Sequence, residues 1–117
     1  MPKILIVDDD RSMVKLLTTL LQLDGFQVIH EARGAEVLGI IRAQRPDAVL
    51  MDVHLSDADG IDLLRQVRAD AAIGGTPIII ASGEDVRYQC EEAGANGFIL
   101  KPYSPDQLTE ALKKAIV

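Results

Sequence analysis

The sequence predicts an α/β fold, a parallel β-sheet with helices on both faces, formed by five strand-then-helix units. Short apolar runs rich in β-branched residues recur along the chain, and a longer segment with helical spacing of apolar residues follows each run. Several runs are apolar almost throughout rather than alternating, which is typical of strands covered by helices on both faces. The expected strands are Lys3–Val7, Phe26–His30, Ala48–Met51, Pro77–Ala81 and Gly97–Leu100.

Three helices are expected after the first three strands. The first has an apolar stripe at i, i+3, i+4, i+7 and i+8, and Gly25 is its expected C-cap; the stripe consists of Met13, Leu16, Leu17, Leu20 and Leu21. The second ends before Pro46 and contains Val37, Leu38, Ile40 and Ile41. The third precedes the breaker pair Gly74 and Gly75 and contains Ile61, Leu64, Val67 and Arg68.

Two further helices are expected after the last two strands. The fourth, Glu84 to Ala93, has few large apolar residues, so we expect it to pack less firmly than the others. The fifth, Ser104 to Ile116, begins with an N-cap serine and a proline at the first helical position. Its expected buried residues are Leu108, Leu112 and Ile116.

Length and composition predict one domain over residues 1–117. A chain of 117 residues buries roughly two-thirds of its unfolded surface, so it forms a core without disulfides. The net charge of −6 argues against a surface that binds nucleic acid or an anionic membrane. The single cysteine fits a reducing compartment, and no apolar stretch approaches the about 20 residues of a membrane span. A cytoplasmic location is therefore expected.

Polar residues follow four of the five expected strands. Asp8, Asp9 and Asp10 follow the first strand, Asp52 the third, Ser82 the fourth and Lys101 the fifth. Ligands of open parallel sheets bind beyond the carboxyl ends of the strands, so these residues should converge. Clustered carboxylates repel one another unless a cation neutralises them, and oxygen ligands select Mg²⁺. An aspartate beside a metal ion, a lysine and a hydroxyl predicts phosphoryl transfer with the carboxylate as nucleophile.

The chain resembles the receiver domains of response regulators in two-component signalling. The resemblance covers nearly the whole chain and rests on several motifs in order at the strand ends: residues 4–10 (ILIVDDD), residues 45–47 (RPD) leading to residues 50–53 (LMDV), Asp59-Gly60, residues 77–83 (PIIIASG) and residues 94–103 (GANGFILKPY). It implies a flavodoxin-like (βα)5 sandwich with strand order 2-1-3-4-5. It also implies a cis Lys101-Pro102 bond, which is plausible because only X-Pro bonds adopt cis cheaply.

The resemblance also implies a role for each residue of the site. Asp52 would accept the phosphoryl group from a phosphohistidine of a sensor histidine kinase or a histidine phosphotransfer protein. Asp9 would bind Mg²⁺, with Mn²⁺ as an alternative, directly, and Asp8 would bind it through water. The ion would also take one oxygen of Asp52 and the backbone carbonyl of His54. Lys101 and Ser82 would contact phosphoryl oxygens, while Asp10 is expected mainly to cap a helix.

The family further implies a switch and a signalling role rather than metabolic catalysis. Ser82 would move toward the phosphoryl group, and Phe98 would turn inward behind it. We expect this pair to shift an equilibrium of the surface formed by the fourth helix, fifth strand and fifth helix, which then binds or releases a protein partner. The domain would catalyse only its own phosphorylation and dephosphorylation. It would act as a monomer or weak dimer, alone or as a module of a longer protein.

The sequence departs from the family's pattern at Ser56 and in the fifth helix. Ser56 stands where relatives usually carry a proline, and it is expected to loosen the loop without touching a chemical group. His54 and Glu84 stand at positions that tune dephosphorylation in the family. The fifth helix lacks the arginine-rich pattern of relatives that dimerise through it.

Three other functions are weighed against this one. A haloacid dehalogenase-type phosphohydrolase would use Asp8 as nucleophile and Asp10 as its partner, but the later acidic pair of those enzymes is missing after Lys101. A flavin or nucleotide-binding protein fails at residues 8–12, which are Asp-Asp-Asp-Arg-Ser rather than a phosphate-binding loop. The intact set of acidic, hydroxyl and lysine residues argues against a receiver-like scaffold that is never phosphorylated.

Overall fold

The computed structural model describes residues 1–116, which form five strands, five α-helices and one 3-10 turn. The elements in chain order are β1 (Lys3–Val7), α1 (Arg11–Leu23), β2 (Gln27–Glu31), η1 (Gly34–Glu36), α2 (Val37–Gln44), β3 (Ala48–Asp52), α3 (Gly60–Ala69), β4 (Ile78–Ser82), α4 (Arg87–Ala93), β5 (Gly97–Leu100) and α5 (Pro105–Ile116).

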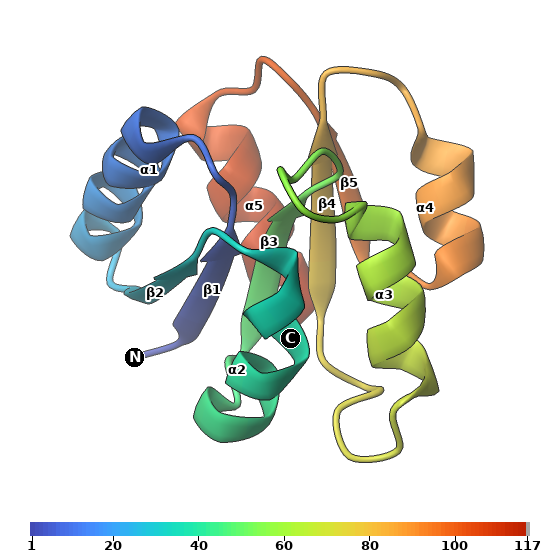
Figure 1. Ribbon diagram of the computed structural model, residues 1–117. Coiled ribbons are helices and arrows are strands. Elements are labelled where there is room, and N and C mark those ends of the chain that lie inside the picture. The colour runs from blue at the N-terminus through green and yellow to red at the C-terminus, as the bar shows by residue number, and fades with distance from the viewer. Residues whose placement is uncertain (117) are drawn as a thin grey trace.

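The five strands form one parallel sheet in the order β2-β1-β3-β4-β5, which confirms the expected topology. The chain order reverses between β1 and β3, and this reversal is where α/β sheets bind ligands. The carboxyl ends of the strands lie together at the top of Figure 1. The polar residues that follow the strands therefore share one edge of the sheet.

Helices cover both faces of the sheet and form two apolar clusters (Figure 1). One cluster joins α2, α3 and α4 to one face through residues such as Val37, Leu64 and Cys90. The other joins α1 and α5 to the opposite face through Leu17 and Leu112. Alternate residues of β1, β3 and β4 belong to opposite clusters, so these strands are apolar almost throughout.

Most expected elements form, with shifts at their ends. β2, β3 and β4 each end one residue later than expected, and β2 and β4 also begin one residue later. Helix α4 begins at Arg87 rather than Glu84, because the backbone amide of Glu84 bonds to the Ser82 hydroxyl at 3.1 Å. Helix α2 ends at Gln44, where Arg45 adopts a left-handed conformation with φ 46°.

The apolar stripe of α1 is buried less completely than expected. Leu17 and Leu21 are buried, but Leu16 is 56% exposed. The C-cap of α1 is Asp24 rather than Gly25, which follows it with φ 92°.

The caps of α5 confirm its expected start. The Ser104 hydroxyl accepts a hydrogen bond from the Gln107 amide at 3.2 Å, and the Gln107 side chain accepts one from the Ser104 amide at 2.8 Å. Leu108 and Leu112 are buried, whereas Ile116 is only half-buried. None of the helices within residues 1–116 combines the length and the apolar character needed to cross a bilayer.

Candidate functional site

A lysine and two aspartates meet where β1, β3 and β5 end. The Nζ atom of Lys101 lies 3.0 Å from Oδ2 of Asp52 and 3.8 Å from Oδ2 of Asp8. Asp52 is the last residue of β3, and the other two directly follow β1 and β5. Because β1 and β3 are neighbours in a parallel sheet, their ends bring two carboxylates together, and Lys101 reaches both from the far side of β4. The expected convergence of these three residues is present.

Asp8 is the buried carboxylate of the cluster, with 5% of its surface exposed. Burial raises the pKa of Asp8 above its usual value, and the nearby charges of Asp52 and Asp10 raise it further. A hydrogen bond from the Asp10 amide, at 2.9 Å, and the Lys101 charge act in the opposite direction. The net effect is that negative charge at Asp8 is disfavoured, so this edge would gain from a further cation.

The other two aspartates after β1 have separate contacts. Asp10 is the N-cap of α1, and its carboxylate accepts a hydrogen bond from the Met13 amide at 3.1 Å, as expected. This use of Asp10 leaves the phosphohydrolase interpretation without its second aspartate. Asp9 is exposed, and its Oδ2 atom accepts a hydrogen bond from the hydroxyl of Ser56.

Ser82 and Phe98 lie on the neighbouring strands. Ser82 is fully buried, and its backbone carbonyl accepts a hydrogen bond from the Lys101 amide at 2.8 Å. This bond holds the backbone of Lys101 next to the end of β4. Phe98, on β5, is half-buried, and the guanidinium carbon of Arg87 on α4 lies 5.2 Å from the centre of its ring. Phe98, one of the two residues expected to form a switch, therefore contacts α4.

The loop between β3 and α3 returns closely past Asp52. Asp59 caps α3 by accepting hydrogen bonds from the amides of its first turn, the shorter at 2.8 Å. The next residue must be glycine, because a Cβ at Gly60 would lie 2.2 Å from the Asp52 carbonyl oxygen. The His54 amide lies 3.4 Å from Oδ1 of Asp52, and its exposed ring lies 3.5 Å from the carboxylate of Glu84.

Two residues at this edge were missed or misjudged from the sequence. Ser56 was expected to touch no chemical group, and this expectation is wrong, because its hydroxyl contacts Asp9. Tyr103 was not singled out, but burial raises its pKa to about 12, and the charges of Asp8 and Asp52 add to the effect. No local pattern reveals the contact between Ser56 and Asp9, since 46 residues separate them in the chain.

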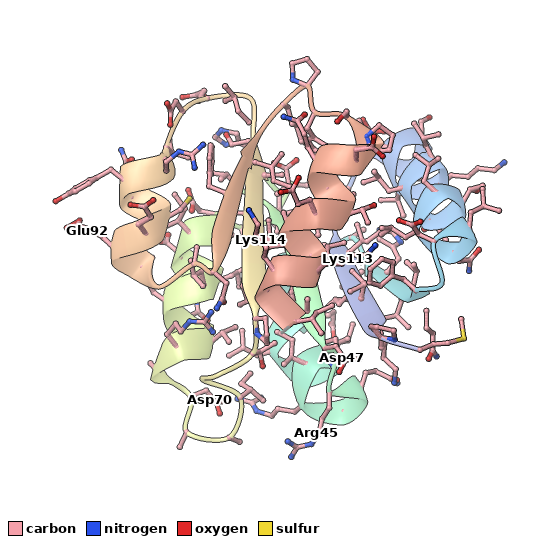
Figure 2. The ribbon with its side chains drawn as sticks, turned by 180° about the vertical axis from the view of Figure 1, so that it is seen from behind. Arg45, Asp47, Asp70, Glu92, Lys113 and Lys114 are labelled. Carbon is pink, nitrogen blue, oxygen red and sulfur yellow. The ribbon has the colours of Figure 1, made fainter. Side chains whose placement is uncertain are left out.

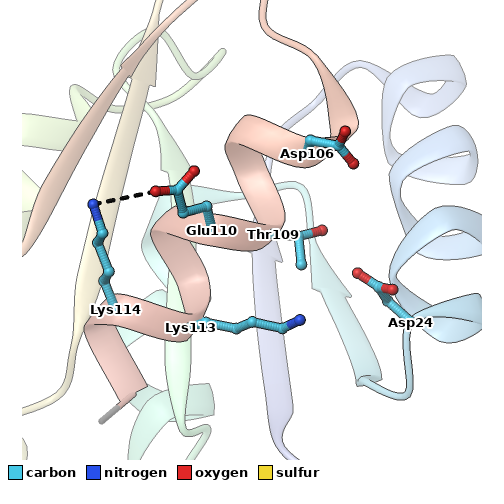
Figure 3. Close-up of a pocket in the computed structure, with 6 residues that line it drawn as sticks. All are labelled: Asp24, Asp106, Thr109, Glu110, Lys113 and Lys114. Carbon is cyan, nitrogen blue, oxygen red and sulfur yellow. Dashed lines mark ion pairs between the residues drawn. The ribbon is translucent and has the colours of Figure 1, made fainter.

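Two hollows on the surface contain none of the site's carboxylates. One of about 340 Å³ is mostly apolar and lies between α1 and the loop after β5; it is lined by Met13, Leu16, Leu17, Leu20, Lys101, Pro102, Tyr103 and Pro105. The other, of about 670 Å³, lies between the end of α1 and α5 (Figure 3). Lys114 and Glu110 form an exposed ion pair of 3.4 Å at its edge. The Lys101-Pro102 bond next to the first hollow is cis, as expected.

The acidic side chains at this edge do not form a complete set of metal ligands by themselves. Among residues 1–116, no group of three or more His, Cys, Asp or Glu side chains is arranged to hold a metal ion. Two carboxylates beside one lysine nevertheless supply oxygen donors, which are the ligands of hard cations. An ion here would complete its coordination with water and backbone carbonyls.

Several proteins of known sequence are similar to this chain over nearly its whole length. The chain is 35% identical over 114 residues to the DNA-binding response regulator MtrA of Mycobacterium tuberculosis, which covers 95% of the chain and 49% of that protein. It is 34% identical over 113 residues to sporulation initiation phosphotransferase F of Bacillus subtilis, covering 96% of the chain and 91% of that protein. The chain thus spans about half the length of the MtrA proteins that it matches.

Solved structures of receiver domains are also similar to this chain over nearly its whole length. A response regulator from Chloroflexus aurantiacus superposes with a TM-score of 0.92 at 33% identity, covering 99% of this chain and 98% of that one. The receiver domain of the sensor histidine kinase PA1611 of Pseudomonas aeruginosa, which has a magnesium ion in its active-site cleft, superposes with a TM-score of 0.89 at 30% identity, covering 98% and 97%. The family model for the response regulator receiver domain matches residues 4–113. The chain belongs to the response regulator receiver domain family, a family of signalling domains.

Proposed function

We propose that this domain accepts one phosphoryl group on Asp52 from a phosphohistidine of a sensor histidine kinase or a histidine phosphotransfer protein. The observation that carries the proposal is the position of the Lys101 ammonium, 3.0 Å from Asp52 and 3.8 Å from Asp8. This geometry supports Asp52 as the acceptor because Asp52 ends β3 in the middle of the sheet, whereas Asp8 is more deeply buried.

The transfer needs a nucleophile and groups that stabilise negative charge. A carboxylate oxygen of Asp52 attacks phosphorus, the phosphorus–nitrogen bond breaks, and its electron pair stays on the imidazole nitrogen, which is then protonated. The Lys101 ammonium would move from pairing with the carboxylate to pairing with a phosphoryl oxygen, and the Ser82 hydroxyl would donate a hydrogen bond to another. The domain thus catalyses its own modification, and hydrolysis of the acyl phosphate returns it to the starting state.

Mg²⁺, or Mn²⁺ in its place, is the proposed cofactor. Asp8, Asp9, Asp52 and the backbone carbonyl of His54 would hold it. The raised pKa of Asp8 supports this assignment, because a bound cation would relieve the cost of its buried charge. Since the side chains alone do not form a complete ligand set, the ion would keep water ligands, as Mg²⁺ normally does. When bound, the ion would neutralise charge on the phosphoryl oxygens.

Phosphorylation is proposed to change the surface formed by α4, β5 and α5. Ser82 and Phe98 are the proposed switch, and the stacking of Arg87 on the Phe98 ring supports a link between β5 and α4. The surface would bind or release a protein partner. NMR tests this part: phosphorylation should shift the amide signals of residues 84–103, and an unchanged spectrum in that segment would refute the switch.

The proposed setting is a cytoplasmic domain spanning residues 1–117 that contacts other proteins as a monomer or weak dimer. The net charge of −6 supports protein partners rather than nucleic acid for this domain itself. DNA binding is stated for the longer MtrA proteins, of which the chain covers 49%. The domain would work alone or as a module of a longer protein.

Intact-mass spectrometry after incubation with acetyl phosphate and Mg²⁺ tests the proposal. We expect one added phosphoryl group on the wild-type protein, none on Asp52→Asn, and none after chelation of the metal. Asp47→Asn, which removes a carboxylate at the opposite end of β3, should react like the wild type. An adduct that survives Asp52→Asn but not Asp8→Asn would refute the assignment of the acceptor. No adduct under any condition would refute the function.

A further inference from the structure

The loop between β3 and α3 has two side-chain anchors that point in different directions. A hydrogen bond of 3.1 Å from the Leu55 amide to the Ala58 carbonyl closes a tight turn. Ser56 and Asp57 form the tip of this turn. The Asp57 side chain reaches the segment after β2, and the Ser56 side chain reaches the segment after β1. The tip therefore joins two strand-end segments that are far apart in sequence.

Asp57 attaches the tip to the start of the short turn η1. Its two carboxylate oxygens accept hydrogen bonds from the amides of Gly34, at 2.8 Å, and Ala35, at 3.1 Å. These bonds lower the pKa of Asp57, so the carboxylate stays ionised at neutral pH. The approach is close, because a Cβ at Gly34 would lie 2.5 Å from the Cβ of Ala58. The backbone of the tip is thus held in one position.

Ser56 contacts the proposed metal ligand Asp9. Its hydroxyl donates to the Oδ2 atom of Asp9, and within residues 1–116 the Asp9 carboxylate accepts no other hydrogen bond. Asp9 is exposed, so its side chain would otherwise be free to change rotamer. A serine side chain has one rotatable bond before its oxygen, which makes the contact depend on where the backbone of residue 56 lies.

We propose that Ser56 is a positioning residue that orients Asp9 for the metal ion, and that the bonds from Asp57 hold Ser56 in place. The inference rests on the proposed function, because that function makes Asp9 a metal ligand. The Ser56 hydroxyl donates to Oδ2 of Asp9, so Oδ1 would be the oxygen available to an ion. Hydrogen bonds that orient ligating carboxylates contribute to metal affinity, and their loss typically weakens binding about 10- to 100-fold.

Metal affinity, rather than activity, is the quantity to measure. Binding of Mn²⁺ is followed by the electron paramagnetic resonance signal of the free ion, and Mg²⁺ affinity by its competition with Mn²⁺. We expect Ser56→Ala to weaken both affinities by about tenfold. Ser56→Thr keeps the hydroxyl and should bind within about twofold of the wild type. Asp57→Ala should weaken binding in the same direction, and the double variant should be no weaker than the weaker single variant, because the two residues act through one contact.

Matched controls separate this effect from general loss of a hydroxyl or a charge. Thr19→Ala removes an exposed hydroxyl that donates to the Lys15 carbonyl at 3.1 Å on α1. Asp47→Ala removes a carboxylate that, like Asp57, accepts from a backbone amide, here Lys3 at 2.7 Å. Asp47 lies at the lower end of the sheet in Figure 2, away from the proposed site. Both controls should keep wild-type metal affinity, and thermal unfolding in the absence of metal checks that each variant folds.

The outcomes distinguish this inference from the function on which it rests. If the wild type accepts no phosphoryl group under any condition, the proposed function fails. If it is phosphorylated but binds no divalent ion, the proposed cofactor fails and the role of Ser56 fails with it. If the wild type binds the ion and Ser56→Ala binds it equally or more tightly, only the role of Ser56 is overturned. Equal weakening in Ser56→Ala and Ser56→Thr would overturn the role of the hydroxyl. Unchanged affinity in Asp57→Ala would overturn the role of the second anchor.

Discussion

Arg68 on α3 should be among the side chains whose removal most destabilises the fold. Its guanidinium donates to the carbonyls of Gly94 at 2.9 Å, Gly74 at 3.0 Å and Thr76 at 2.7 Å, and to Oδ1 of Asn96 at 2.7 Å. The carbonyls of Gly74 and Thr76 are part-buried, and hydrogen bonds from a charged donor contribute about 1.5 kcal/mol or more each. The two exposed acceptors can bond to water instead. Arg68→Ala should therefore lower the free energy of unfolding by about 3 kcal/mol.

Urea unfolding at neutral pH, with the change in midpoint converted at constant slope, measures this loss. Arg65→Ala is the matched control on the same helix. Arg65 forms an exposed ion pair of 3.1 Å with Asp62, and its removal should cost less than about 1 kcal/mol. Arg68→Lys keeps the charge but cannot reach four acceptors, so it should fall between the two. A loss below about 1 kcal/mol for Arg68→Ala would refute the argument that its hydrogen bonds to the two part-buried carbonyls stabilise the fold.

Two further predictions concern the edge of the sheet that carries the site. Burial, with two nearby carboxylates, raises the pKa of Tyr103 to about 12, so in a Tyr88→Phe background the phenolate absorbance should appear near that pH. The phenol's contribution to stability is then complete below about pH 10, its unfolded value, and is lost as the pH rises toward 12. A titration near pH 10 would contradict this. Gly60→Ala should destabilise the fold by about 1 to 3 kcal/mol in urea unfolding, because its Cβ would lie 2.2 Å from the Asp52 carbonyl oxygen. Gly39→Ala, with open space at the Cβ position on α2, should instead leave stability unchanged or slightly raised, and equal effects of the two variants would refute the steric argument.

The strand-end residues of the site could be placed from the sequence, because each belongs to a local pattern. An apolar strand followed by Asp52 or Lys101 reveals both the strand and its end. The parallel sheet then brings the ends to one edge without further information. The cap at Asp10 was equally local, since its partner is the amide of Met13 three residues later.

Contacts between distant loops could not be placed in this way. The bond from Ser56 to Asp9 joins the loops after β3 and β1, and it depends on how the turn at residues 55–58 is held against η1. The exposure of Leu16 is similar, because helical periodicity marks an apolar face but does not say how wide a part of it a neighbouring helix covers.

By itself the sequence determined the number and order of the strands and helices, the edge at which polar groups gather, and the family of the domain. Those properties depend on local periodicity, on caps, and on a parallel sheet in which every strand ends on the same side. Only the tertiary structure decided the partners of polar groups that lie in different segments of the chain. Examples are the ion pairs of Lys101, the bonds from Arg68 to Gly94 and Asn96, and the contact of Ser56 with Asp9. Each joins segments that come within hydrogen-bond distance only when the chain folds.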